Sequence, residues 1–206
     1  MNFPARRFTV VAATLITALG TAVSSASAGA TGSWSVTPAG AYTAVHAVPS
    51  TFNFPSMIVA CGSFDVTAGK LEATGTTGGG IGTIDAITIH DCSVGGIEYI
   101  VTKSASPWAI SLVGQNPAHA NWVDVSIKNV AANWYGFGCT IDFKGTLHGH
   151  YENDTGRLVI GDTSGDLLAS NANCLGLVNN GDVVELRASL RMAMASTGKA
   201  PVIRAL

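Results

Sequence analysis

Three residues in this chain have types and spacing that could bind a metal ion. His148, His150 and Glu152 occur at i, i+2 and i+4, so they would share one face of a β-strand. Two neutral imidazoles and a carboxylate are suitable ligands for a divalent cation. The same pattern also fits the solvated face of a strand that ends in a hairpin, because Glu152 directly precedes turn-forming residues. We favour this second interpretation and expect no metal or other cofactor, so the three residues are weak ligand candidates.

A histidine and a serine lie in short segments that resemble the catalytic boxes of small secreted chymotrypsin-like proteases. They are His46 and Ser164, the latter within Gly161–Gly165. Such an enzyme aims the serine hydroxyl at the imidazole while a backbone N–H of a preceding glycine holds the oxyanion. Here Asp162 occupies that glycine position and Thr163 is inserted before the serine. A turn rich in Gly, Asp and Ser explains the segment without chemistry, and we assign no catalytic residue.

Aromatic residues suggest a third kind of site, a platform on which sugar rings could stack. The candidates are Trp34, Trp108, Trp122, Trp134, Tyr135 and Phe137. Aromatic side chains in strands more often fill the core, and we favour that role for them. Thr76–Gly82 lacks the spacing and the lysine of a phosphate-binding loop. The carboxylates are scattered singly and show no facing pair for acid–base catalysis.

These residues must be positioned by β-strands. Apolar and polar residues alternate over sixteen positions from Phe137 to Glu152. A period of two predicts a half-buried antiparallel strand. Gly145 and Gly149 are the expected bend or bulge points within it.

Further strands are expected along the whole chain after residue 32. They are Gly32–Ala44 with a turn at Pro38/Gly40, Met57–Thr67 with a break at Gly62, Leu71–Thr74, Ile81–Ile89, Ile97–Val101, Trp108–Val113, Trp122–Val130, Arg157–Ile160, Gly165–Ala169 and Asp182–Ala195. Turns or loops are expected at Ala68–Leu71, Thr74–Gly80 and Asn153–Gly156. About ten to twelve short strands predict one all-β domain, an antiparallel β-sandwich or a barrel.

Four cysteines follow residue 60, which is an even number. They are Cys61, Cys92, Cys139 and Cys174, and no two lie within four residues of each other, so their spacing does not fit a zinc site. Three disulfide pairings are possible. We favour 61–92 with 139–174, because each bond would then staple one half of the chain. The two segments share an order of cysteine, strand, Gly-(Lys/Arg)-Leu turn, strand and cysteine, which suggests an internal duplication.

The N-terminal segment is typical of an export signal. Arg6 and Arg7 precede an apolar stretch from Phe8 to Val23, and small residues at 26 and 28 suit cleavage after Ala28. The arginine pair leaves the general and the twin-arginine export routes both open. We therefore expect a signal peptide over 1–28 and a secreted domain over 29–206, with no membrane association after cleavage.

Charge argues against one class of partner. Without Arg6 and Arg7 the formal net charge changes from −2 to −4, and no basic cluster remains. We therefore expect no nucleic-acid partner.

Several stretches, in order along most of the mature chain, resemble a family of small secreted actinobacterial proteins. The stretches are the Trp-x-Val-x-Pro opening near residue 34, Gly80–Ile84, Pro107–Trp108 and Cys174–Asp182. Members of this family are β-rich, uncharacterised proteins with paired cysteines. Ala39 departs from the family pattern, which has glycine there. The resemblance implies secretion, β structure and disulfides, and it brings no catalytic residues.

Taken together, the sequence predicts a non-catalytic binding or structural module of the extracellular space or the cell envelope. The sequence does not identify the partner, and a cell-wall or polysaccharide surface is one candidate. Two other classes stay open at this point. One is a small secreted hydrolase or metal-dependent enzyme, and the other is an envelope-spanning β-barrel, because long alternating strands also build pores.

Overall fold

The computed structural model describes residues 32–104, 106–161 and 164–206, and every regular element in these ranges is a β-strand. The strands are β1 (Ser33–Thr37), β2 (Gly40–His46), β3 (Ser50–Phe54), β4 (Met57–Leu71), β5 (Thr74–Thr76), β6 (Gly80–Val94), β7 (Ile97–Lys103), β8 (Trp108–Gln115), β9 (Trp122–Gly136), β10 (Cys139–Glu152), β11 (Arg157–Gly161), β12 (Leu167–Asn173), β13 (Glu185–Met194) and β14 (Val202–Ala205). The all-β prediction is confirmed. No described element is a helix long and apolar enough to cross a membrane.

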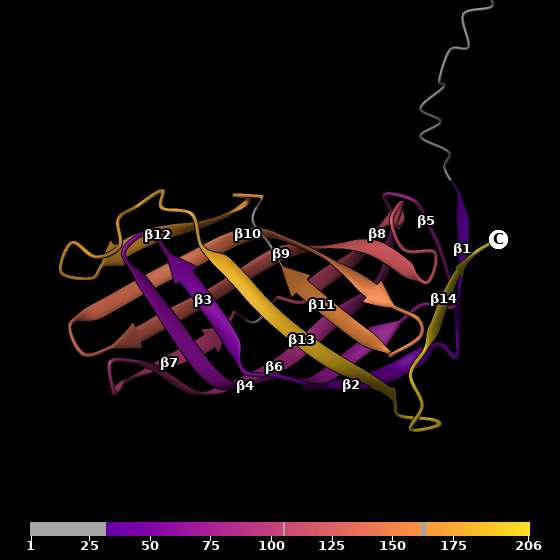
Figure 1. Cartoon of the computed structure of the whole chain (residues 1–206), viewed down its shortest axis with the longest axis horizontal. Coiled ribbons are helices and arrows are strands. Elements are labelled where there is room, and N and C mark those ends of the chain that lie inside the picture. Colours follow the sequence, from indigo (N-terminus) through magenta and orange to yellow (C-terminus); the bar gives the residue numbers. More distant parts are fainter. Residues whose placement is uncertain (1–31, 105, 162–163) are drawn as a thin grey trace, which may run out of the picture.

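The strands close into an antiparallel barrel with eight positions (Figure 1). Neighbours in the barrel follow the order of the chain: β2 with β3, β4, β6, β7 with β8, β9, β10, β11 with β12, and β13. Closure comes from β13, which pairs with both β2 and β3. Of the two architectures expected from the sequence, the sandwich and the barrel, the structure is therefore a barrel.

Three of the eight positions are filled by two short strands instead of one long strand. The ladder of β9, for example, pairs with β7 through residues 132–136 and with β8 through residues 123–128. Asn129 lies in the skipped segment and has a φ of 59°. This left-handed conformation interrupts the ladder and separates the two short partners.

Alternation of side chains fills the barrel with an apolar core. On β10, Ile141, Phe143, Leu147 and Tyr151 are all buried, whereas polar residues such as Lys144 and His148 face outward. The ring of Trp134 packs against Phe52, Phe54 and Tyr99 at centroid distances of 5.2–5.6 Å. Small barrels of this strand number have just enough interior for side chains.

The strand predicted from Phe137 begins at Cys139 instead. Phe137 and Gly138 form the turn between β9 and β10, and Phe137 is 82% exposed. Gly138 supplies the positive φ of 69° that this connection needs. Farther along β10, the register shift falls between Gly145 and Leu147, so the bulge predicted at Gly145 is confirmed. At Gly149 the register is regular, and the close approach of the Val159 carbonyl explains the glycine.

Three other local predictions were wrong. Leu71–Thr74 was expected to be a strand, but β4 ends at Leu71 and β5 begins at Thr74. Ala68–Leu71 was expected to turn, but it is the last part of β4, where Gly69 lies against the ring of Tyr42. Thr74–Gly80 was expected to be a loop, but it contains the short strand β5. At Gly62 the side-chain alternation does switch as predicted, yet β4 continues unbroken because Asp91 opposite, with a φ of 56°, switches β6 at the same place.

The two barrel ends are covered and fixed in different ways. At one end, to the right in Figure 1, β14, β1 and β5 form a separate three-stranded sheet that buries Trp34 and Ile203. Toward the other end lie two disulfides, Cys61–Cys92 between paired strands and Cys139–Cys174 between β10 and the segment after β12. The predicted pairing is confirmed, and paired disulfides of this kind indicate an oxidising compartment.

Candidate functional site

The main polar cluster lies on the outer wall where β9 begins and β10 ends. His150 pairs across the ladder with Asp124, and Glu152 pairs with Trp122. Their strand neighbours Val123 and Tyr151 point into the barrel and are buried. Alternation therefore places Trp122, Asp124, His150 and Glu152 together on the outside of the same two strands.

Three aromatic rings form a stack at the centre of this cluster. The ring centroids of His119 and Trp122 are 3.8 Å apart, and those of Trp122 and His150 are 4.0 Å apart with an interplanar angle of 7°. Two rings this close to one indole must cover its opposite faces. Both faces of Trp122 are therefore occupied by protein, so this indole is not a free sugar platform.

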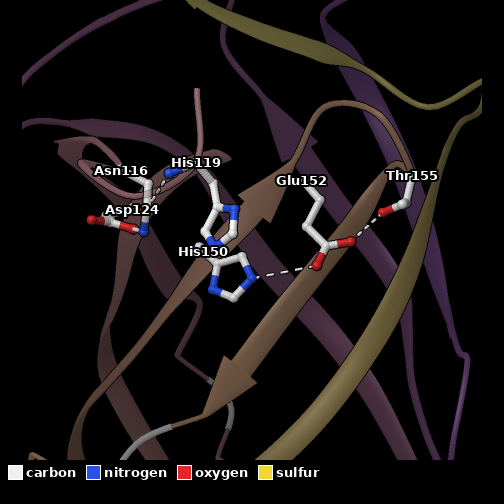
Figure 2. A network of polar contacts seen from close by, with 6 residues as sticks. All are labelled: Asn116, His119, Asp124, His150, Glu152 and Thr155. Carbon is white, nitrogen blue, oxygen red and sulfur yellow. Dashed lines mark hydrogen bonds and ion pairs between the residues drawn. The ribbon is translucent and has the colours of Figure 1, made fainter. Parts of the chain in front are cut away.

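Hydrogen bonds and an ion pair fix the residues around the stack (Figure 2). The Nε2 atom of His150 lies 3.4 Å from Oε1 of Glu152, and the hydroxyl of Thr155 donates to Glu152. The carboxamide of Asn116 donates to Oδ1 of Asp124 at 2.7 Å.

The loop that carries His119 is held by the same asparagine. Oδ1 of Asn116 accepts the backbone N–H groups of Ala118 and His119, both at 3.0 Å. His119 therefore comes from a loop, and it precedes His150 by 31 residues in the chain. No sequence pattern pointed to Asn116, His119 or Thr155, whereas the outward direction of Trp122 follows from the alternation with Val123 and Val125.

The weak metal candidates do not converge on one point. Nε2 of His148 lies 2.9 Å from Oδ2 of Asp166, whereas His150 faces Glu152 and Trp122. Neighbouring histidines on one strand face thus contact different carboxylates. Among the residues that the structure describes, no three His, Cys, Asp or Glu side chains are grouped to hold a metal ion.

The protease-like residues lie on different strands with another strand between them. Oδ1 of Asp65 lies 2.9 Å from Nδ1 of His46 and accepts its backbone N–H at 2.7 Å. Ser164 follows the end of β11, and β13 lies between β11 and β2 in the sheet. The structure therefore gives His46 a carboxylate partner but separates it from Ser164 by an intervening strand. Asp162 and Thr163 lie outside the described residues.

The predicted core role holds for three of the four tryptophans. Trp34, Trp108 and Trp134 are buried. Trp122 is the exception described above, and Tyr135 is about half exposed. Tyr135 lies near the other end of β9, about 40 Å from Trp122 along the strand. The exposed aromatic residues therefore do not form one platform.

Comparison with known proteins adds no family to these observations. No protein-family model, curated protein or solved structure matches this chain.

Proposed function

We propose that this protein is an exported, non-catalytic binding or structural module of the extracellular space or the cell envelope. The observation that carries the proposal is the division of the molecule into a filled interior and a wall of mutually bonded polar side chains. The largest side chains pack inside the barrel, so a ligand would meet the outer wall or the ends. A closed, stapled barrel is a rigid support for recognition by its surface.

Polar side chains on the outer wall also bond to one another outside the stacked cluster. Asp142 accepts hydrogen bonds from the carboxamides of both Asn133 and Asn171. His46 is bonded to Asp65, and His148 contacts Asp166. Such pairs hold side chains in fixed positions, which suits a preformed binding surface.

The alternative of a hydrolase or metal-dependent enzyme is less well supported. A serine route would require Ser164 to meet His46 across β13. A metal route would require His148 and His150 to turn from separate carboxylates to one ion. Both routes need groups held near their productive geometry.

The alternative of an envelope-spanning barrel conflicts with the polarity of the wall. Membrane-spanning barrels are apolar outside and polar inside. On β10 the order is reversed, because Phe143 and Leu147 are buried while Lys144 and His148 face outward.

Retention on isolated cell walls tests the proposal. Purified mature protein should co-sediment with cell-wall material or an envelope polysaccharide, and heat-denatured protein should not. In parallel, esterase, glycosidase, peptidase and muramidase substrates should show no turnover above that control. Turnover that is abolished by a single substitution at His46 or Ser164 would contradict the proposal.

A further inference from the structure

The barrel wall is open along one seam. β6 pairs with β7 only through Cys92–Val94 and with β8 only through Gly80–Ile84. Within the described chain, residues 85–91 of β6 and residues 100–103 of β7 have no ladder partner across this seam. We call the space between these two edges the β6–β7 fissure.

Backbone conformation explains why the strands part. At Asp91 the φ of 56° bends β6 directly before Cys92, the first β6 residue that pairs with β7. At the other end, register shifts with β4 surround Ala86. A left-handed residue and register shifts of this kind bend a strand and can end its pairing on one side.

Both walls of the fissure are nevertheless edges of well-formed sheet. β6 keeps its ladder with β4 along the fissure, next to the Cys61–Cys92 disulfide. β7 keeps its ladder with β9 through residues 99–103. Successive residues of a strand direct their N–H and C=O groups to alternate sides, so about half of the residues on each edge offer these groups to the fissure.

Hollows follow the fissure along its length. One of about 410 Å³ is lined by Asp85–His90 and Ile100–Ser104, and a second of about 270 Å³ continues past Asp91. Ile89 and Val101 both line the first hollow, and they are 8% and 7% exposed, more than any other buried core residue. Ile100 on the rim is 51% exposed. The core is thus least covered where the ladder is missing.

We propose that the β6–β7 fissure binds an extended segment of another polypeptide, which adds to the barrel wall as an extra strand. Facing rows of backbone donors and acceptors select a strand over a sugar or a helix, because only a strand presents both groups on both sides. The walls run antiparallel to each other, so the added strand pairs parallel with one and antiparallel with the other. The fissure accommodates about five to seven residues, at roughly 3.3 Å per residue.

Charge defines the chemistry of that segment. The facing walls are uncharged over Ala86–Ile89 and Ile100–Thr102. Charged groups occur only at the two ends, with Asp85 and Lys103 at one and Asp91 and Glu98 at the other. An unpaired charge in the middle would lose its hydration without compensation. The partner is therefore a segment of alternating aliphatic and hydroxylic residues, such as Val and Thr.

This inference rests on the proposed binding role and names a partner class for it. A protein that binds no peptide could still be retained on cell walls, so the two experiments test the two proposals independently.

A capped, fluorescein-labelled peptide, Gly-Val-Thr-Val-Thr-Val-Thr-Gly, is the probe. Fluorescence anisotropy should show saturable binding to the mature protein with a Kd below about 100 μM. N-methylation of the three valines should weaken binding about tenfold or more, and so should N-methylation of the three threonines. Each change removes the backbone N–H donors that point to one of the two walls. Hydrogen exchange should slow in residues 85–91 and 100–103 when the peptide is bound.

A matched pair of variants locates the site. Ile100→Lys places a charge on the rim and should weaken binding about tenfold or more. Val113→Lys changes a residue on β8 that is equally exposed, at 49%, and should leave the Kd within about twofold. Absent binding, binding that tolerates N-methylation, or equal effects of the two variants would overturn the proposal. Concentration-dependent dimers would also overturn the proposal if they slowed hydrogen exchange of the same amides without peptide. The fissure would then be occupied by a second copy of the chain.

Discussion

Trp122 is the central ring of the aromatic stack on the outer wall. Its indole stacks on both His119 and His150, and each such aromatic pair contributes about 0.5–1.5 kcal/mol beyond burial. Trp122→Ala should therefore lower the free energy of unfolding by about 1–3 kcal/mol in urea denaturation. Tyr135→Ala, on the outside of the same strand, is the matched control and should change it by no more than about 0.5 kcal/mol. Equal effects would show that the stack contributes nothing.

Metal binding by the strand histidines is testable at the same scale. His148 and His150 contact different carboxylates, so binding one ion would require both pairs to break. Calorimetric titration with zinc, nickel and manganese should reveal no site tighter than about 10 μM. His148→Ala and His150→Ala should behave alike. A micromolar site that is lost in His150→Ala would revive the metal-dependent enzyme.

The sequence predicted on which face of a strand individual side chains lie, but it did not predict which residues they contact. Alternation placed His148, His150 and Glu152 on the polar face, where they lie. It did not predict that His119 would stack on Trp122 or that Asp166 would approach His148. Those contacts depend on loop conformation and strand register, which a period of two does not encode.

Among the elements, β4 shows how tertiary packing overrides a local turn signal. The Cβ of an alanine at Gly69 would meet the ring of Tyr42 and would lie 2.7 Å from the carbonyl oxygen of Thr83. Gly69→Ala should therefore lower the free energy of unfolding by about 1–3 kcal/mol, the usual effect of overpacking. Gly114→Ala on β8 meets no atom within 4 Å and should change it by no more than about 0.5 kcal/mol. Urea denaturation of both variants measures the difference, and a neutral Gly69→Ala would contradict the packing argument.

The same contact explains why the sequence misplaced a turn. Ala68-Gly69-Lys70 has turn-like composition, but its glycine makes room for Tyr42, whose hydroxyl donates to the Thr83 carbonyl at 3.1 Å. Burial, with a smaller contribution from Asp85, raises the pKa of Tyr42 above its ordinary value, so the phenol stays a donor. The strand from Arg157 and the strand before Ala195 were predicted correctly, because their alternation has no such competing contact.

For the whole molecule, the disulfides fix one end of a barrel whose closure joins distant parts of the chain. Their cysteines are 31 and 35 residues apart. In the loop-entropy account each bond stabilises the fold by about 3–4 kcal/mol through the unfolded state. Cys61→Ser with Cys92→Ser should therefore lower the free energy of unfolding by that amount, and Cys139→Ser with Cys174→Ser should have a similar effect. A large difference between the two double variants in urea denaturation would show that native contacts, not loop length, set the contribution.

The sequence predicted an antiparallel all-β fold and both disulfides, but it left the sandwich and the barrel open. The choice depends on β13 reaching β2 and β3, for example through the pairing of Leu190 with His46. No local pattern specifies a contact over such a separation. The β6–β7 fissure could not be predicted either, because it arises from the conformation of Asp91 and from register shifts around Ala86, which no local pattern encodes.

Export is the property of the whole chain on which the proposed role depends. Residues 1–28 lie outside the described residues, and the first strand begins at Ser33, shortly after the predicted cleavage at Ala28. Two disulfides with no free cysteine suit the oxidising side of a membrane. Intact-mass analysis of secreted protein should show a chain that begins at Gly29 and lacks four hydrogens relative to its reduced form. Ala28→Leu should block cleavage, because the peptidase accepts small residues there, whereas Ser27→Leu should not. Secreted protein that retains residues 1–28, or that has titratable thiols when folded, would contradict export by this route.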